Sequence, residues 1–249
     1  MTVRALLFDL WGTLIHVDDL EGDANVRRKA YVSYVSATLD EVGLLYPVDE
    51  VSAAVKVVVS EMRDLHEQGR DISAPERLER LLETLQPGLP GDISREALEK
   101  LEDGSMWAVR QHPVLAVKGA LAALTEARSR GLGVGLVSIT GMTPGYVLRD
   151  VLDGHGLLRH FEALTFSDEA RMAKPAPEIF HCTLEVLGVE ADEAVFIGDT
   201  PFADVAGPQA LGMTAIQVGS RQEDGVTPDA RIDSLEELFP ALARLGLVD

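Results

Sequence analysis

Beyond about residue 112, short apolar runs alternate with segments of helical periodicity, and this alternation constrains the fold more than any other feature of the chain. Short apolar runs bounded by turn residues are typical of strands that are buried on both faces. Strands that alternate with helices form a parallel sheet with helices on both sides. The sequence therefore predicts an α/β protein with a doubly wound, Rossmann-like parallel sheet. The expected strands are 134–137, 163–166, 194–197 and 214–218, and the expected helices are 118–129, 177–187 and 201–211.

A further strand of this kind is expected near the N-terminus, and it ends in a carboxylate. The apolar run 5–8 leads directly to Asp9, and Gly12 lies in the turn that follows. An open parallel sheet binds its ligands at the carboxyl ends of its strands, so Asp9 is predicted to lie where chemistry takes place. An aspartate before a turn also commonly serves as a cap, so Asp9 alone does not define a site.

Four more polar residues follow later strands or the loops beyond them. Ser138 ends the first strand of the alternating region, and Lys174 lies in a proline-containing loop. Asp199 follows the strand after that loop, and Asp204 comes five residues later. Each of these residues alone has an ordinary structural role, as a cap or a solvated side chain. Together, and in this order, they point to a site around Asp9.

The order of these residues, an aspartate, a serine, a lysine and an acidic pair, resembles the haloacid dehalogenase (HAD) superfamily, and the resemblance spans nearly the whole chain. It implies a hydrolase in which Asp9 attacks the substrate and forms a covalent intermediate, an aspartyl-phosphate in the phosphatases. Ser138 and Lys174 would then be catalytic as well. Lys174 would place a positive charge on the transferring group, with Asp204 orienting its ammonium group.

The resemblance also implies a Mg²⁺ cofactor, held by Asp9, Asp199 and the backbone carbonyl of Trp11. Mg²⁺ would hold together two anions that otherwise repel each other, the Asp9 carboxylate and the substrate phosphate. A backbone carbonyl places no demand on its own side chain, so tryptophan at position 11 is compatible with this ligand set.

The expected substrate is a small phosphorylated metabolite, bound at the same edge of the sheet. Ser138 would donate its hydroxyl to a phosphate oxygen, and Lys174 would contact the same group. The backbone N–H groups of Gly12, Thr13 and Ile139 are expected to add further hydrogen bonds.

Two positions depart from the usual HAD pattern. Phosphatases of this type usually carry a second aspartate two residues after the nucleophile, where this chain has Trp11, and asparagine is common at the position of Ile139. An indole N–H cannot act as an acid at neutral pH, and a positioned acid is worth about 10² to 10⁴ in rate. The chain then needs a substrate with a good leaving group, or another acid from among His16, Asp18 and Asp19, or its turnover is slow.

A metal-independent 2-haloacid dehalogenase is the alternative enzyme, because such enzymes carry an aromatic residue at the position of Trp11. A carbon–chlorine bond also needs no proton to break. Ile139 and the retained Asp199 argue against this alternative, and the sequence places neither Arg27 nor Arg28 over the nucleophile. A third hypothesis is a binding module that keeps the HAD fold and Mg²⁺ but turns over poorly. We favour the phosphatase over the dehalogenase.

A long insert separates the first strand from the alternating region. Strand character is expected to stop after Leu14, and the pattern from about residue 24 to 107 is helical and rich in charge. Residues 1–15 and 112–249 are therefore predicted to form the catalytic core, with residues 16–111 as a helical cap that sets specificity. The insert's position resembles that of the helical caps in one HAD subgroup. Its expected helices include 27–39, 48–67 and 75–85.

The charge balance limits the partners. The chain carries 22 Lys and Arg against 41 Asp and Glu, a net charge of −19 at pH 7. Such a chain repels a phosphate backbone, so nucleic acid is not an expected partner, whereas a cation and a lysine can still attract a small phosphate locally. No apolar run approaches the roughly 18 to 20 residues of a membrane span, so no membrane partner and a cytoplasmic location are expected.

Overall fold

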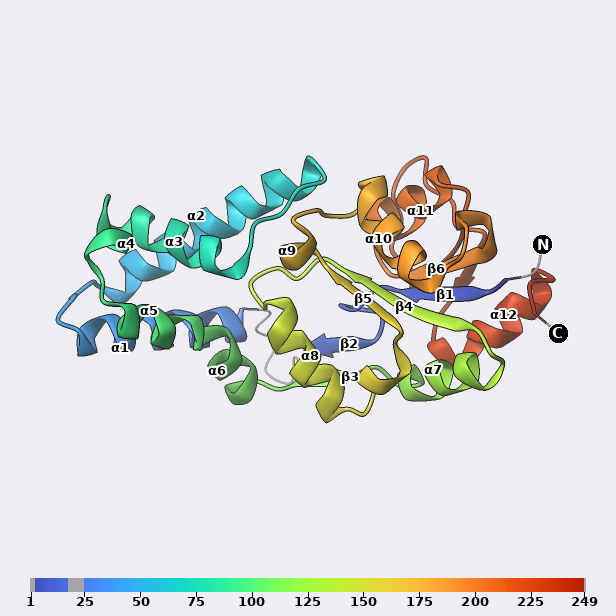
Figure 1. Ribbon diagram of the computed structural model, residues 1–249, viewed down its shortest axis with the longest axis horizontal. Coiled ribbons are helices and arrows are strands. Elements are labelled where there is room, and N and C mark those ends of the chain that lie inside the picture. The colour runs from blue at the N-terminus through green and yellow to red at the C-terminus, as the bar shows by residue number, and fades with distance from the viewer. Residues whose placement is uncertain (1–2, 18–24, 249) are drawn as a thin grey trace.

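The computed structural model describes residues 3–17 and 25–248, and these residues form a six-stranded parallel sheet (Figure 1). The strand order is β5-β4-β1-β6-β7-β8, so β1 lies inside the sheet and the chain winds outward from it first on one side and then on the other. This is the order of a doubly wound sheet, and it confirms the predicted fold class. The strands are β1 Ala5–Phe8, β4 Gly133–Ser138, β5 Ala163–Phe166, β6 Ala194–Gly198, β7 Thr214–Val218 and β8 Ala230–Ile232.

Helices cover both faces of this sheet, which explains why its strands are apolar on both sides. Successive side chains of a strand point to opposite faces. Leu6 and Phe8 of β1 therefore pack in one hydrophobic cluster with α7, α8 and α12, whereas Ala5 and Leu7 pack with α10 on the other face. The helices of this region are α7 Ala120–Ser129, α8 Gly145–Gly154, α9 Ser167–Ala170, α10 Pro177–Leu187, α11 Gly207–Ala210 and α12 Leu238–Arg244. Short 3₁₀ turns span Leu158–His160, Ala191–Glu193 and Leu235–Glu237.

The described residues between β2 and β3, from 25 onward, are mainly helical and have a hydrophobic cluster of their own, separate from the two clusters that cover the sheet. In Figure 1 its helices form a layer beyond the carboxyl ends of the sheet strands. Ser73 and Glu76 form a reciprocal capping box at the start of α3, so the chain itself marks where that helix begins. The helices are α1 Val26–Glu41, α2 Val48–Glu67, α3 Ala74–Leu85, α4 Leu89–Asp92, α5 Arg95–Glu102 and α6 Gly104–Gln111.

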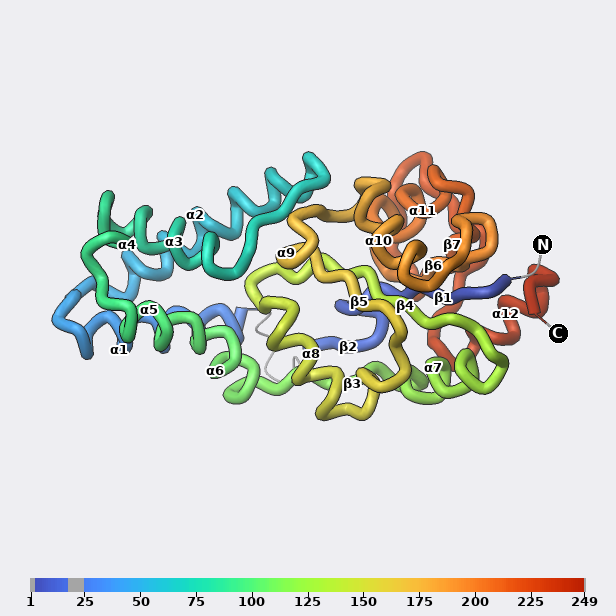
Figure 2. Tube along the Cα trace, viewed as in Figure 1, coloured from blue at the N-terminus to red at the C-terminus, as the bar shows by residue number. Residues whose placement is uncertain are grey.

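A short pair of strands joins the two regions. β2, Ile15–Val17, and β3, Val114–Ala116, pair in antiparallel fashion where the chain leaves the sheet region and where it returns (Figure 2). The expectation that strand character stops after Leu14 is therefore wrong. A three-residue strand is too short to produce a recognisable period, and the pairing arises because both ends of the insert meet at one place.

The predicted helix 201–211 is divided in the structure. Residues Pro201–Ala206 form a π-helical segment, and α11 starts only at Gly207. Pro208 has no N–H to donate to the Asp204 carbonyl, which is where a regular helix would have placed a hydrogen bond. The irregular segment holds Asp204 next to β6 with its side chain buried.

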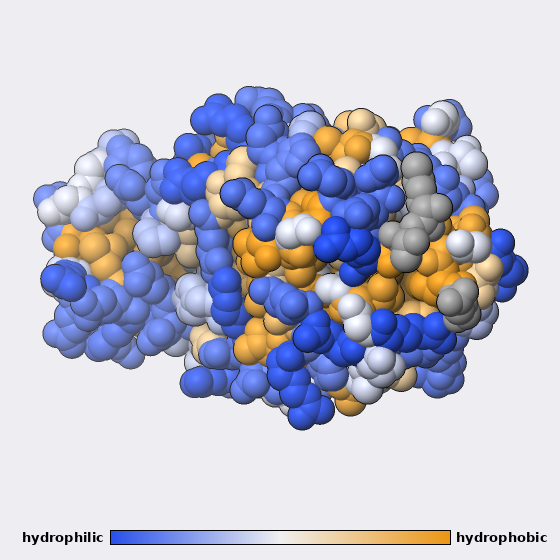
Figure 3. All heavy atoms as spheres, turned by 45° about the vertical axis from the view of Figure 1, so that its right-hand side comes forward, coloured by the Kyte–Doolittle hydropathy of each residue, from blue (hydrophilic) through white to orange (hydrophobic). Residues whose placement is uncertain are grey.

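The molecular face in Figure 3 is largely hydrophilic, with apolar areas interrupted by polar side chains. The large apolar side chains that are exposed come from separate elements, for example Leu45, Val186 and Phe202. Among the described helices, none combines the length and the apolar character needed to cross a bilayer.

Candidate active site

The carboxyl ends of β4, β1 and β6 bring the predicted polar residues to one edge of the sheet. β1 lies between β4 and β6, with Phe8 opposite Leu136 on one side and Ile197 on the other. The Asp9 N–H then donates to the Ile197 carbonyl at 2.8 Å. The strands that lead to Asp9 and Asp199 are therefore neighbours. This is also the point where the winding of the sheet reverses, which is where ligands bind in open α/β sheets.

Lys174 links two of the predicted carboxylates. Its Nζ donates to Asp9 Oδ1 at 2.6 Å and to Asp204 Oδ1 at 2.7 Å, and all three side chains are buried. The other oxygen of Asp204, Oδ2, accepts the backbone N–H of Thr200 at 2.9 Å. Since both oxygens of Asp204 are hydrogen-bonded, this residue is well placed to orient the Lys174 ammonium group.

The charges at this edge are only partly compensated. Burial raises the pKa of Asp9 above its ordinary value, and the Asp204 carboxylate adds to the shift despite the opposing effect of Lys174. Burial followed by the Asp204 charge raises the pKa of Asp199 as well. Burial alone would lower the pKa of Lys174, but Asp204 and Asp9 raise it above its ordinary value. One ammonium group thus faces more negative charge than it can neutralise.

The residues present fit a divalent cation. Ligand atoms of Asp9, Asp199 and Asp204 lie within 4.8 Å of one another. Both oxygens of Asp204 accept hydrogen bonds, from Lys174 and from the Thr200 backbone. Lys174 binds Asp9 through Oδ1, and Asp199 Oδ2 faces the exposed Arg221, so Asp9 and Asp199 are the better candidates for ligands. Gly12, with φ of +78°, keeps the space beside them open, since a Cβ atom there would lie 2.6 Å from Asp199 Oδ2. Carboxylate oxygens with excess negative charge are the donors that Mg²⁺ prefers.

Arg221, which sequence reasoning missed, reaches the same carboxylate. Its Nη1 lies 3.2 Å from Asp199 Oδ2 and donates to Thr200 Oγ1 at 3.1 Å. Thr200 Oγ1 in turn donates to Asp199 Oδ1 at 3.0 Å. The side chain of Arg221 is 66% exposed, so it can move away when a cation binds. Nothing in the local sequence marks this contact, because Arg221 comes from the loop after β7.

The predicted phosphate-binding groups are only partly available. Ser138 lies buried at the end of β4, and its Oγ donates to the Ile139 carbonyl at 3.3 Å. The N–H of Gly12 already donates to Ile15 and that of Thr13 to Leu10. Both N–H groups thus donate within the turn in this structure, and their contact with phosphate stays a prediction. The hydroxyl of Thr13, by contrast, is buried and has no hydrogen-bond partner within the described part of the chain.

Among the residues that the structure describes, no suggested replacement acid has a contact with Asp9. His16 is exposed on β2, and its Nδ1 lies 3.1 Å from the Val17 carbonyl. Asp18 and Asp19 lie outside the described residues. Of the three candidates only His16 is described, and it does not serve as a proton donor beside Trp11 in this structure.

Trp11 itself is half-buried, and the guanidinium group of an arginine stacks on its ring. It packs against the hydrophobic cluster on the α7 side of the sheet. The guanidinium carbon of Arg27, from the start of α1, lies 4.5 Å from the centre of the indole ring. Trp11 and Ile139 also line a cavity of about 480 Å³ between the sheet edge and helices α1, α2 and α6.

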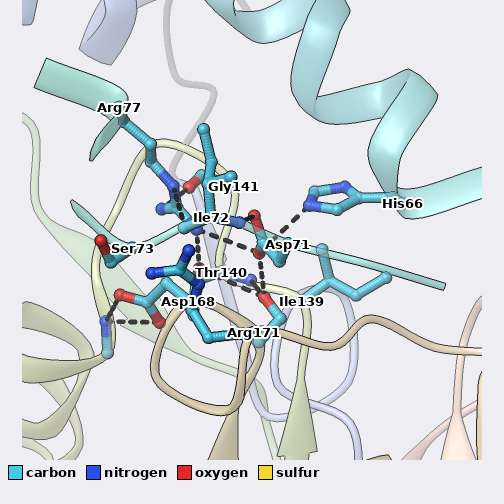
Figure 4. A network of polar contacts seen from close by, with 12 residues as sticks. His66, Asp71, Ile72, Ser73, Arg77, Ile139, Thr140, Gly141, Asp168 and Arg171 are labelled. Atoms are coloured by element: carbon cyan, nitrogen blue, oxygen red, sulfur yellow. Dashed lines mark hydrogen bonds and ion pairs between the residues drawn. The ribbon is translucent and has the colours of Figure 1, made fainter. Parts of the chain in front are cut away.

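A buried ionic cluster connects the helical layer to the loop after Ser138 (Figure 4). Asp71, between α2 and α3, accepts hydrogen bonds from Arg77 Nη2 at 3.0 Å and from Ser167 Oγ at 2.6 Å, and His66 Nε2 lies 3.1 Å away. Arg77 also donates to Thr140 Oγ1 at 3.0 Å. Burial alone would raise the pKa of Asp71, but the neighbouring His66 ring and the charge of Arg77 hold that pKa below its ordinary value.

Comparisons with known proteins agree with this geometry. A family model described as haloacid dehalogenase-like hydrolase matches residues 3–212. Phosphoserine phosphatase of Thermus thermophilus is 40% identical over 164 residues, which cover 61% of this chain and 64% of that protein. The chain thus spans less than two thirds of that relative. Phosphoglycolate phosphatase of Rhodospirillum rubrum is 28% identical over 213 residues, which cover 86% of this chain and 78% of that protein.

A solved structure supports the fold. The 2-haloacid dehalogenase from Pseudomonas syringae superposes with a TM-score of 0.70 over 98% of this chain and all (100%) of that one, at 23% identity. At that identity the likeness shows the fold alone. Since the family model spans most of the chain and the strand ends bring its signature residues together, the chain belongs to the haloacid dehalogenase-like hydrolases.

Proposed function

We propose that this protein is a Mg²⁺-dependent phosphatase that hydrolyses a small phosphorylated metabolite through an aspartyl-phosphate on Asp9. The observation that carries the proposal is the buried Lys174 between Asp9 and Asp204, with Asp199 beside them. A nucleophile, a cation for the transferring phosphoryl group and a second carboxylate are the parts that this chemistry needs. Relatives named as phosphatases, at 28% to 40% identity, support the same assignment.

In the proposed reaction the Asp9 carboxylate attacks phosphorus, and the bond from phosphorus to the leaving oxygen breaks. Water then hydrolyses the aspartyl-phosphate and regenerates Asp9. Lys174 stabilises the charge on the transferring group, held in place by Asp204, and Ser138 donates to a phosphate oxygen. Mg²⁺ on Asp9, Asp199 and the Trp11 carbonyl would offset the repulsion between carboxylate and phosphate and favour the ionised form of Asp9.

Two features weigh against the dehalogenase alternative. Asp199 is present at the metal-ligand position and forms an acidic group with Asp9. Ile139 provides no side-chain amide at the position where the dehalogenases carry asparagine. Likeness to a solved dehalogenase at 23% identity does not favour that activity.

We also propose that residues 16–111 act as a cap over the core formed by residues 1–15 and 112–249. The separate hydrophobic cluster of the helices and the cavity at their boundary with the sheet support this division. A cap in this position would exclude water from the site during turnover.

The metal assignment predicts that Asp199→Ala weakens Mg²⁺ binding by at least about tenfold and lowers phosphatase activity with it, because one of two carboxylate ligands is lost. Isothermal titration calorimetry with Mg²⁺ measures the affinity. Asp192→Ala, which removes an exposed aspartate before β6, is the matched control and should leave the affinity unchanged. An unchanged affinity in Asp199→Ala would show that the ion is held elsewhere.

The tryptophan at position 11 predicts a dependence on the leaving group. Without a proton donor, aryl and acyl phosphates should be hydrolysed faster than alkyl phosphates, since their leaving groups need no proton. Trp11→Asp should raise alkyl phosphate turnover by up to about 10² and leave aryl phosphates almost unchanged. Steady-state rates on both substrate series measure this, with Trp11→Phe as the control that adds no carboxyl group. Equal wild-type rates on both series would contradict the missing-acid interpretation.

A further inference from the structure

The cavity between the helical layer and the sheet edge is rich in positive charge, although the protein as a whole is strongly acidic. Arg27, Arg28 and Arg63 line it, and none of its described lining residues is acidic. In a chain with a net charge of −19, a surface region of average composition would contain more carboxylates than cationic side chains. The cavity therefore favours an anionic occupant.

Arg27 is the arginine of this cavity that is best suited to bind a ligand. Its Nη1 is buried and has no hydrogen-bond partner among residues 3–17 and 25–248. Burial lowers the pKa of Arg27 to about 10, which still leaves the guanidinium charged at neutral pH. A buried donor without an acceptor is rare in folded proteins and is commonly matched by a ligand or ordered water. Arg27 thus lacks an acceptor that a bound molecule could supply.

The contact with Trp11 explains how Arg27 could recognise a particular group. The guanidinium lies over the indole ring at 4.5 Å, so the ring supports one face of the cation. A guanidinium donates its hydrogen bonds within its own plane, in a fork that matches the two oxygens of a carboxylate. Stacking on Trp11 therefore holds Arg27 without using up its donors.

The cavity also lies at the right place relative to the nucleophile. Two of its lining residues adjoin the proposed catalytic groups, since Trp11 lies two residues after Asp9 and Ile139 directly follows Ser138. A molecule whose phosphate contacts Asp9 can extend its other end past Trp11 into this space. A volume of about 480 Å³ is in the range for small-molecule sites.

We propose that Arg27, held on Trp11, binds a carboxylate at the far end of the substrate, so that the protein selects small phosphorylated carboxylic acids over phosphates with an uncharged end. This inference rests on the proposed phosphatase function and names its substrate class. Arg28 and Arg63 add attraction for the same anion at longer range. Trp11 then serves as a platform for a specificity-determining arginine, which accounts for its presence where related phosphatases have an acid.

The test compares phosphoglycolate with ethyl phosphate, in which a methyl group replaces the carboxylate. Wild-type protein with Mg²⁺ should prefer phosphoglycolate. Arg27→Met should lower kcat/KM for phosphoglycolate by about 10- to 100-fold, mainly through KM, and change ethyl phosphate less than about threefold. Arg27→Lys, which keeps the charge without the fork, should fall between. Arg95→Met removes an exposed arginine of α5 and is the control for loss of one positive charge.

Two outcomes would overturn the inference while the phosphatase function stands. The first is active wild-type protein in which Arg27→Met affects both substrates equally or neither. The second is a preference for the bisphosphate of ethane-1,2-diol over phosphoglycolate, which would assign Arg27 to a second phosphate. Thermal unfolding of each variant identifies any general loss of structure.

The phosphatase function itself would be contradicted by a different result: wild-type protein that does not hydrolyse p-nitrophenyl phosphate in the presence of Mg²⁺. Calorimetry then still tests Arg27, since wild-type protein should bind phosphoglycolate more tightly than ethyl phosphate and Arg27→Met should abolish that difference. Equal binding of the two compounds by the wild type would overturn the carboxylate site without any reference to turnover.

Discussion

Asp9→Asn is expected to reduce phosphatase activity by at least about 10⁴-fold, because removing a covalent nucleophile eliminates the pathway rather than slowing one of its steps. Asparagine has nearly the same shape as aspartate, so the packing around β1 should survive. Steady-state hydrolysis of p-nitrophenyl phosphate with Mg²⁺ measures the loss. Asp192→Asn, at an exposed position before β6, is the control and should retain full activity.

A direct test of the intermediate accompanies this variant. Wild-type protein quenched in acid during turnover of a labelled substrate should carry covalent phosphate that hydroxylamine releases, since acyl phosphates react with hydroxylamine. The Asp9→Asn protein should carry none. Covalent label in the variant, or activity within tenfold of the wild type, would exclude Asp9 as the nucleophile.

Lys174→Met is expected to destabilise the protein by about 3–5 kcal/mol at pH 8 without Mg²⁺, because it leaves two buried carboxylates without their cation. Lys174 lies 2.6 Å from Asp9 and 2.7 Å from Asp204, and its side chain is 2% exposed. Denaturant unfolding measures the loss. Lys118→Met is the control, since Lys118 pairs with Glu236 at 3.0 Å but is 83% exposed, and such surface pairs contribute about 0–1 kcal/mol.

The dependence on pH follows from the directions of the pKa shifts. The pKa of Lys174 is raised in the folded protein, so its stabilising contribution is fully present below the ordinary lysine pKa and is lost only as pH rises through the folded value. The pKa of Asp9 is also raised, and losing Lys174 raises it further, so the folded variant gains stability as Asp9 takes up a proton. The destabilisation should therefore be smaller at pH 5 than at pH 8. Equal destabilisation at both values would contradict this account.

The strand-end residues could be predicted because a parallel sheet gathers the ends of its strands at one edge. Asp9, Ser138 and Asp199 each follow or end an apolar run, and the sheet order places those runs side by side. Lys174 and Asp204 can be recognised by their order in the chain. Their hydrogen bond depends on the conformation of loops, which hydrophobic periodicity does not predict. The turn after Asp9 shows the limit, since the Gly12 and Thr13 N–H groups bind within the turn itself.

Three side-chain contacts that could not be predicted join residues from different elements or loops. Arg27 stacks on Trp11, Arg221 reaches Asp199, and Asp71 binds Ser167. Each contact depends on how one element packs against another, and periodicity reports only which face of an element is buried. The unusual tryptophan at position 11 was the one local signal, and its explanation required a residue from the helical insert.

The pairing of β1 with strands far along the chain has a consequence for the order of folding. The buried residues of the helical insert lie within 30–108, so its hydrophobic cluster can form from contacts within that one segment. β1 precedes that segment but pairs with β4 and β6, which are synthesised much later. Contacts between distant segments form slowly because a long loop must close first. We therefore expect the helices of the insert to fold on the ribosome before β6, which leads to Asp199, has been synthesised. The helices that line the cavity beside Trp11 would then form before the catalytic residues come together.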